Sequence, residues 1–195
     1  MLAIVQTIAV GLLALATSTG AVGSGAEETL PDRSEYLRVA EPELRHLVAD
    51  GLLRSETFQR MVTDVGRSRW LVYVQRGPCP EKAAVACLLD VVGTYHGRRY
   101  VRVLVSYKGR HADSVIATLG HELQHVLEVA QEPAVTDRAS MRDLFRRIGT
   151  VRIRGARTTV YETARAQAAG DQVSRELRRA GRRGTERDAV ARGGS

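Results

Sequence analysis

Two histidines and a glutamate lie within five consecutive residues, His121-Glu122-Leu123-Gln124-His125. If this segment is helical, His121 and His125 lie one turn apart, and both imidazoles can bind one zinc ion. Glu122 lies beside His121 and can reach a water molecule bound to that ion without being a ligand itself, as a general base must. The spacing therefore predicts a zinc site with His121 and His125 as metal ligands and Glu122 as the catalytic residue.

The residues around this motif have the apolar periodicity of a helix. The pattern begins at Asp113 or Ser114, continues to about Gln131, and ends before Pro133. Its apolar stripe consists of Val115, Ile116, Leu119, Leu123, Val126, Leu127 and Ala130. The two histidines lie on the opposite side, so we expect them to face away from the surface that packs on the core.

The flanking residues make this segment similar to the zincin metallopeptidases, which carry an HExxH helix. Zincin helices usually have Val or Thr three residues before the first His, and here that residue is Thr118. They have uncharged residues between Glu and the second His, and apolar residues after it, as this chain does. The resemblance implies a zinc metallopeptidase with a zincin-like α+β fold, in which a small antiparallel sheet packs with the HExxH helix and further helices. The alternative is an ordinary amphipathic helix whose polar face holds two histidines.

A catalytic zinc ion usually takes a third protein ligand. The longer metzincin pattern is absent, because Glu128 stands where that pattern has Gly and Gln131 stands where it has His. The resemblance is therefore gluzincin-like, which implies a Glu followed by small residues on a later helix. Glu162-Thr163-Ala164-Arg165-Ala166 fits this pattern. Glu162 also heads a stripe of small and apolar residues, and a carboxylate that faces a core needs a partner such as a metal ion.

Other roles remain open for these carboxylates. Thr159 and Glu162 have capping-box spacing, in which Glu162 would only accept a hydrogen bond from the Thr159 amide. Glu128 lies on the same side of its helix as His125, either as an alternative ligand or as an outer partner of an imidazole. Asp137 is a third candidate ligand, by loose analogy with aspzincins.

His111 and Tyr161 flank the two helices that would form the site. Each could stabilise an oxyanion. Residues in such places are also commonly helix-end or packing residues, and the sequence does not separate the two roles.

The remaining elements are two helices, three strands and two further helices. Apolar spacing predicts helices over residues 41–54 and from Ser55, which is expected to cap the second. Strands are expected at 70–74, 84–92 and 100–107. A short turn with glycines joins the last two, which predicts an antiparallel hairpin whose strand 100–107 could hold an extended peptide. Helices over 140–148 and from 159 to about 179 complete an α+β order.

The first 26 residues contain no charged side chain, and residues 2–16 are almost continuously apolar. This pattern predicts a signal peptide over residues 1–26, with Ala26 as its last residue. An uncleaved N-terminal anchor is the alternative, because the segment approaches the roughly 20 residues that span a bilayer. Residues 27–180 have the size of a single zincin-like metallopeptidase domain. Cys79 and Cys87 are expected to form a disulfide, which agrees with a secreted or periplasmic protein.

The formal net charge is +7, and Lys82 and Lys108 are the only lysines. Much of the positive charge lies after Arg175, and residues 181–195 are expected to form a basic flexible tail. No nucleic-acid motif accompanies it, so we expect a peptide or protein substrate, no nucleic acid, and a membrane only if the N-terminal segment stays uncleaved. The alternatives are a non-catalytic exported domain that binds a metal or a partner and, more weakly, a protein that binds polyanions through its tail.

Overall fold

The computed structural model describes residues 32–81, 84–154 and 159–193, and the side chains of these residues except 153, 154 and 184–193. The expected signal peptide or anchor, residues 1–26, lies outside this part of the chain. Among the residues that the structure describes, none of the helices has the length and apolar character needed to cross a membrane.

Five strands form one mixed sheet in the order β1-β2-β5-β3, and β4 also pairs with β5. The strands are β1 (Leu37–Val39), β2 (Leu71–Arg76), β3 (Ala86–Leu88), β4 (Gly93–Tyr95) and β5 (Arg98–Val105). The α+β class is confirmed, but the purely antiparallel sheet is wrong, because β1, β2 and β5 run parallel. A parallel pair needs a long crossover, which the helices between β1 and β2 provide.

The strand β5 lies in the interior of the sheet. It pairs with β2 on one side and with β3 and β4 on the other. Both antiparallel pairings confirm the predicted hairpin, whose tight turn places His96 and Gly97 at positive φ. The expectation that this strand holds an extended peptide is wrong, since both of its edges are occupied. Among the described strands, β3 pairs only with β5, so its other edge pairs with no strand.

The disulfide predicted from the sequence is present between Cys79 and Cys87, whose Cα atoms lie 5.9 Å apart. It ties the segment after β2 to the middle of β3. This link restrains the short edge strand in addition to its hydrogen bonds to β5.

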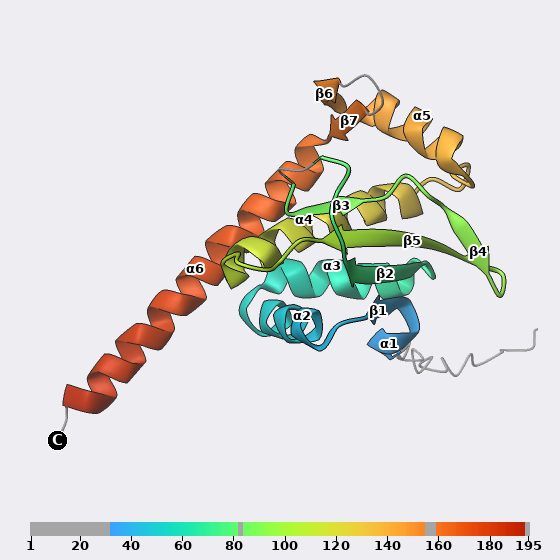
Figure 1. Cartoon of the computed structure of the whole chain (residues 1–195). Helices are drawn as coiled ribbons and strands as arrows, with labels where there is room; N and C mark the ends of the chain where they lie inside the picture. The colour runs from blue at the N-terminus through green and yellow to red at the C-terminus, as the bar shows by residue number, and fades with distance from the viewer. Residues whose placement is uncertain (1–31, 82–83, 155–158, 194–195) are drawn as a thin grey trace, which may run out of the picture.

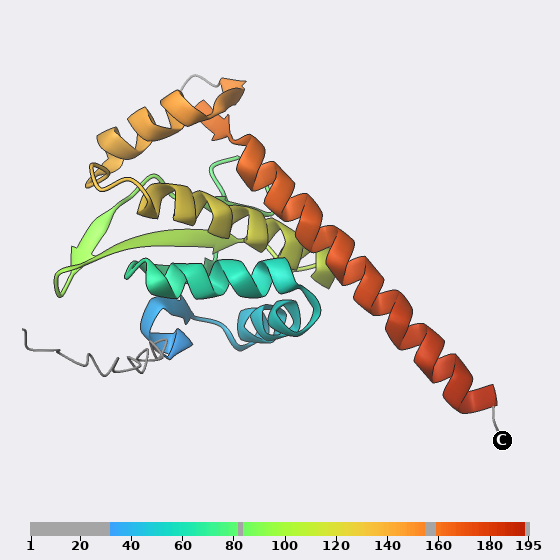
Figure 2. The same ribbon diagram turned by 180° about the vertical axis from the view of Figure 1, so that it is seen from behind.

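Six helices accompany the sheet in the described part of the chain. They are α1 (Arg33–Tyr36), α2 (Pro42–Arg54), α3 (Glu56–Arg67), α4 (Ala112–Ala130), α5 (Arg138–Ile148) and α6 (Ala164–Gly193). Figures 1 and 2 show α2, α3 and α4 gathered on one side of the sheet, with α6 crossing them diagonally. The interior between these layers contains fully buried valines of the sheet, namely Val72, Val74, Val101, Val103 and Val105. The helix that carries the histidines is therefore fixed on the sheet from one side and by α6 from another.

The first helices and α4 agree with the sequence patterns. Ser55 caps α3 by accepting a hydrogen bond from the amide of Phe58. The predicted HExxH helix is confirmed as α4, and Leu119 and Leu123 lie on its buried side with at most 1% of their surface exposed. The helix α5 begins at its cap Asp137 and ends at Gly149, close to the predicted bounds.

The last helix begins later than the sequence predicted. Residues Thr159–Glu162 form the strand β7, which pairs with β6 (Thr150–Arg154) in a separate two-stranded sheet. The β-branched and aromatic residues of this segment suit a strand. The capping-box role of Glu162 is therefore wrong, because the residue ends a strand instead of opening a helix. Beyond it, Ala166, Val173 and Leu177 are fully buried, as the apolar stripe predicted.

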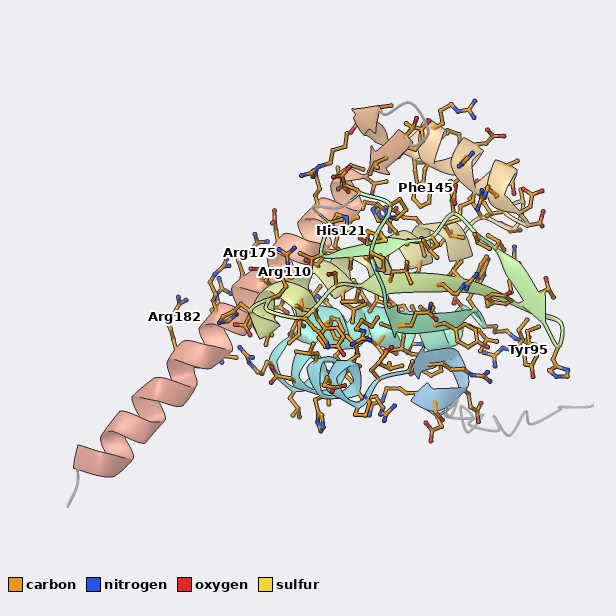
Figure 3. The ribbon with its side chains drawn as sticks, viewed as in Figure 1. Tyr95, Arg110, His121, Phe145, Arg175 and Arg182 are labelled. Atoms are coloured by element: carbon orange, nitrogen blue, oxygen red, sulfur yellow. A yellow bond between two sulfur atoms is a disulfide. The ribbon has the colours of Figure 1, made fainter. Side chains whose placement is uncertain are left out.

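The backbone of α6 is helical to Gly193, into the region from residue 181 for which the sequence predicted a flexible tail. This region contains four Arg, two Ala and one Glu, which are strong helix formers, alongside several glycines. The end of α6 extends away from the rest of the protein, with Arg182 on the extending part (Figure 3).

Candidate metal centre

The helix α4 carries two of the residues with metal-binding chemistry, and α6 packs directly beside it. The closeness depends on Gly170 of α6, since a Cβ there would lie 3.1 Å from the Cβ of His121. Figure 3 shows His121 where the two helices meet. The small residues of α6 thus permit the close approach that the sequence predicted for Ala166 and Gly170.

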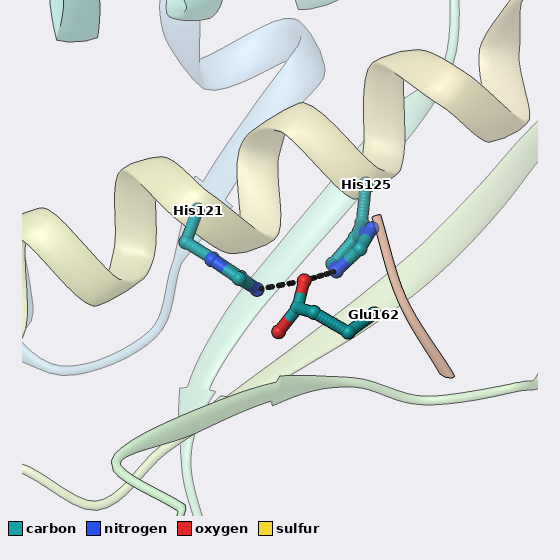
Figure 4. Close-up of side chains that lie close together, drawn as sticks. All are labelled: His121, His125 and Glu162. Carbon is teal, nitrogen blue, oxygen red and sulfur yellow. Dashed lines mark ion pairs between the residues drawn. The ribbon is translucent and has the colours of Figure 1, made fainter. Parts of the chain in front are cut away.

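The side chains of His121, His125 and Glu162 converge on one point. The Nε2 atoms of His121 and His125 lie 3.3 Å and 3.5 Å from the same oxygen, Oε1 of Glu162 (Figure 4). The ligand atoms of all three lie within 4.8 Å of one another. Ligand atoms in a tetrahedral zinc site, each about 2.0–2.1 Å from the ion, lie about 3.3–3.4 Å from each other. The three residues could therefore hold a metal ion.

The chemistry of these donors also points to a cation. The Nδ1 of His125 lies 2.9 Å from Oε2 of Glu128, a carboxylate that is 4% exposed. In neutral His125 the proton lies on Nδ1 in this hydrogen bond, so Nε2 presents a lone pair toward Oε1 of Glu162. Two acceptors that face each other need a positive charge between them, either a proton or a metal ion.

The same surroundings shift the pKa values of both groups. Burial alone would lower the pKa of His125, but its hydrogen bonds to Glu128 and Glu162 outweigh burial and raise that pKa to about 9. Burial alone would raise the pKa of Glu162, but the hydrogen bonds and charges of His121 and His125 hold it well below its usual value. The metal-free site thus takes up a proton where a metal ion would otherwise lie.

The sequence allowed two roles for Glu128, an alternative ligand or an outer hydrogen-bond partner of an imidazole, and the structure shows the contact of the second role. One of its oxygens faces His125, and the other accepts a hydrogen bond from the hydroxyl of Thr163 at 2.8 Å. With both oxygens occupied, Glu128 is an orienting partner of an imidazole. It does not belong to the group of three ligand atoms.

Glu122 lies on the side of α4 that faces the edge strand β3. Its Oε2 accepts a hydrogen bond from the amide of Leu88 at 2.7 Å, and the side chain is buried. Burial raises the pKa of Glu122, and the charges of His125 and His121 oppose this only in part. A raised pKa brings a carboxylate closer to the range in which it can accept and return a proton near neutral pH.

His121 is the most accessible of the three ligand residues, with 20% of its side chain exposed, against 10% for Glu162 and 8% for His125. It lines a trough of about 490 Å³ between α4 and α6. Other residues of this trough are His111, Thr118, Asp171 and Ser174. Solvent and ligands can therefore reach the candidate metal centre from the side of His121.

The other residues singled out from the sequence lie elsewhere or have structural partners. Asp137 caps α5 by accepting a hydrogen bond from the amide of Ser140 at 2.8 Å, so it has a structural role. His111 is the cap of α4 and lines the trough, while Tyr161 lies in β7 beside Glu162. Over the described residues, no hydrogen bond joins His111 or Tyr161 to the three ligand side chains, so the oxyanion role of both stays a prediction.

Sequence reasoning missed three residues that contact the ligands or their partners, one of which is Arg152, with a guanidinium nitrogen 3.6 Å from Oε2 of Glu162. Thr163 is bonded to Glu128 as described above, and its position just before a helix was the signal of a cap. Phe145 of α5 lies edge-on to His125 with ring centroids 5.2 Å apart. No local pattern identifies such an aromatic neighbour, because it comes from a separate helix.

No family model, no curated protein and no solved structure matches this chain. The arguments for its function therefore depend on the residues and the geometry of the candidate metal centre.

Proposed function

We propose that this protein is a zinc-dependent metallopeptidase, with His121, His125 and Glu162 as the ligands and Glu122 as the general base. The observation that carries the proposal is the convergence of both Nε2 atoms on one oxygen of Glu162, at 3.3 Å and 3.5 Å. Two imidazoles and one carboxylate are a donor set that suits zinc, and three protein ligands leave a position for water. A bound zinc ion would supply Lewis acidity toward a carbonyl and a lowered pKa for its water.

Glu122 would take a proton from the attacking water and deliver it to the leaving amine. Its raised pKa and its place beside His121 and His125 support this role. The hydrogen bond from Leu88 would hold one oxygen in place. In the described part of the chain no hydrogen bond occupies the other oxygen, Oε1, which leaves it for proton transfer.

The substrate would lie along the open edge of β3. The amide of Leu89 donates to the carbonyl of Arg102, and the amide of Ser106 donates to the carbonyl of Val85. Because hydrogen-bonding residues alternate along an antiparallel pair, the backbone groups of Ala86 and Leu88 point away from β5. The amide of Leu88 already donates to Glu122, so the groups that a peptide can use are those of Ala86 and the carbonyl of Leu88. An extended peptide can pair with this edge, which is the edge that Glu122 contacts.

An exported location is part of the proposal. The disulfide Cys79–Cys87 is typical of an oxidising compartment, such as the periplasm or the extracellular space. A secreted or periplasmic peptidase is consistent with this bond.

A second candidate is a zincin-like domain that binds a metal or a partner without hydrolysis. The observation that favours it is the hydrogen bond from Leu88 to Glu122, since a carboxylate that joins α4 to β3 could be purely structural. The two candidates share the three ligands and differ in the role of Glu122.

The decisive experiment combines metal analysis with proteolysis. The purified chain should bind about one equivalent of zinc and cleave an unfolded protein substrate, and a chelator should abolish the cleavage. Glu122→Gln should keep the zinc and lose the cleavage, whereas Glu43→Gln, at an exposed carboxylate of α2, should change neither. Less than about half an equivalent of zinc in the parent protein would refute the metal centre. Zinc binding with full activity in Glu122→Gln would refute the base, and zinc binding without any cleavage would favour the second candidate.

A further inference from the structure

Thr163 lies between the proposed third ligand and the carboxylate that orients His125. Its hydroxyl donates a hydrogen bond to Oε1 of Glu128 at 2.8 Å, and its amide donates to Oε1 of Glu162 at 3.0 Å. Both Thr163 and Glu128 are buried, with 3% and 4% of their surfaces exposed. One residue therefore contacts both carboxylates that surround His125.

The same hydroxyl also fixes the start of α6. It accepts a hydrogen bond from the amide of Ala166 at 3.1 Å, which is the contact of a helix cap. A hydroxyl has one proton to donate, and here that proton goes to Glu128. The start of α6 and the orientation of Glu128 are thus fixed by a single group.

The consequence for the metal centre follows from the bonds of Glu128. With Oε1 held by Thr163, Oε2 stays at 2.9 Å from Nδ1 of His125. This bond places the proton of neutral His125 on Nδ1 and leaves Nε2 free to bind a metal ion. Without the hydroxyl, Glu128 would have a buried oxygen without a partner, and its side chain could turn away from the imidazole.

We propose that Thr163 is a positioning residue of the metal centre. Its hydroxyl holds Glu128 against His125 and its amide orients Glu162, so the first turn of α6 sets the geometry of two of the three ligands. The inference rests on the proposed metal-binding function, and it adds a residue that the HExxH and Glu162 patterns do not include.

A helix cap of similar construction provides a matched control. The hydroxyl of Ser55 accepts a hydrogen bond from the amide of Phe58 and donates one to Glu176 at 2.6 Å. Ser55 therefore also caps a helix and contacts a carboxylate, yet none of these residues belongs to the group that could hold a metal ion. Removing either hydroxyl should cost stability, but only the one at Thr163 should affect metal binding.

The test measures zinc affinity by competition with a chromogenic chelator, together with the thermal unfolding of the metal-free proteins. Thr163→Val keeps the shape of the side chain and removes both hydrogen bonds, and it should weaken zinc binding by about 10–100-fold. Thr163→Ser keeps the hydroxyl and should bind zinc within about threefold of the parent. Ser55→Ala should lower the melting temperature and leave zinc affinity unchanged. The proposal would be overturned if Thr163→Val bound zinc as tightly as the parent. It would also be overturned if Thr163→Ser lost as much zinc affinity as Thr163→Val.

A double-mutant cycle with Glu128→Gln separates positioning from capping. Glu128→Gln leaves the cap of α6 in place and should itself weaken zinc binding by about tenfold. If Thr163 acts through Glu128, the two losses should not add. The variant with both Thr163→Val and Glu128→Gln should then bind zinc about as tightly as whichever single variant binds it less tightly. Independent, additive losses would overturn the proposal. If Thr163→Val does not fold, Glu128→Gln decides, because unchanged zinc affinity in that variant is incompatible with the proposed chain of bonds.

The outcomes also distinguish this inference from the proposed function. A parent protein that binds no zinc would refute the metal centre and this inference together. A parent that binds zinc as tightly as Thr163→Val does would refute only the role of Thr163.

Discussion

Glu162 and Glu176 are both carboxylates that the last part of the chain presents to the earlier helices, and their surroundings differ. Glu176 accepts hydrogen bonds from the hydroxyl of Ser55 at 2.6 Å and from the amide and hydroxyl of Thr57 at 3.0 Å and 2.8 Å. Its partners are neutral donors that satisfy both oxygens. Glu162 instead has two imidazole nitrogens within 3.5 Å of one oxygen.

The difference lies in what each carboxylate still needs. Burial alone would raise the pKa of Glu176, but the hydrogen bonds from Ser55, Gln172 and Thr57 lower it to about 2. That site is complete without any further group, so its role is to join α6 to the start of α3. Glu162 faces Nε2 of His125, which is an acceptor in the neutral imidazole because Nδ1 donates to Glu128, so this contact is complete only with a proton or a cation. The kind of partner that each carboxylate faces thus separates a structural carboxylate, Glu176, from one that could bind a metal ion, Glu162.

The largest effect is expected at Glu162. Glu162→Gln removes the charge of a proposed ligand and should weaken zinc binding at least about 100-fold, a greater loss than an outer partner usually causes. The melting temperature of the metal-free protein should also fall, because the charged carboxylate stabilises the fold through its contacts with His121 and His125. Titration with zinc in the presence of a chelator checks the affinity, and calorimetry checks the stability. Normal zinc binding by this variant would move the third ligand elsewhere.

Glu176→Gln should lower the stability of the fold and leave zinc affinity nearly unchanged. The variant keeps the shape of the side chain and loses charge-assisted hydrogen bonds to Ser55 and Thr57, so it should unfold more easily by about 1–2 kcal/mol. Zinc affinity should stay within about twofold of the parent, since the residue lies outside the group that could hold a metal ion. Urea denaturation of the metal-free protein measures the loss. A variant as stable as the parent would show that these bonds contribute nothing net.

The pH dependence of stability gives a second measurement of Glu176. Its pKa is about 2 in the folded protein, below the ordinary value of 4.5. The carboxylate therefore stabilises the fold above about pH 4.5, and this contribution is lost as the pH falls from 4.5 toward 2. The difference in unfolding free energy between the metal-free parent and Glu176→Gln should accordingly shrink over that range. A difference that is the same at pH 6 and at about pH 3 would contradict the proposed cause.

The helix α4 could be predicted from the sequence because its apolar spacing is long and ends at a proline. Glu162 could be singled out because a carboxylate there precedes the small residues of the next helix. The strand β7 could not, since the stripe from Glu162 to Leu177 suits a helix and its strand partner, β6, is a separate segment. The β-branched and aromatic residues of this segment suit a strand, but the pairing with β6 that makes it one is present only in the folded chain.

The mixed sheet and the hydrogen bond between Glu122 and Leu88 could not be predicted from the sequence for a similar reason. Parallel pairing of β2 with β5 leaves no local pattern, because the two strands are joined through β3 and β4. The partner of Glu122 is the backbone amide of Leu88, and a backbone group has no side-chain signature. Thr163 carries a usable signal, since a threonine directly before the small residues of a helix is a common cap, but the helix predicted from residue 159 placed it in a helix interior.

The smallest effect, and the most local, is expected at Gly170, which sets the distance between α6 and the metal centre. A Cβ at this position would lie 3.1 Å from the Cβ of His121 and 3.4 Å from the carbonyl oxygen of Ala117, so either α6 or the imidazole must move by a few tenths of an ångström. Gly170→Ala should therefore weaken zinc binding by less than about tenfold, below the loss expected for a ligand or an orienting partner.

Gly181→Ala is the matched control, because the same substitution in the same helix meets its nearest atom, on Arg54, at an ordinary 3.9 Å. Both variants gain about 1 kcal/mol of helix propensity, so a general effect on α6 would appear in both. A loss of zinc affinity in Gly170→Ala alone would show that the approach of α6 fixes His121, just as Glu162 and Thr163 fix the other side of the site. Equal zinc affinities in the two variants would mean that α6 can move to accept the added methyl group at residue 170 without displacing the imidazole of His121.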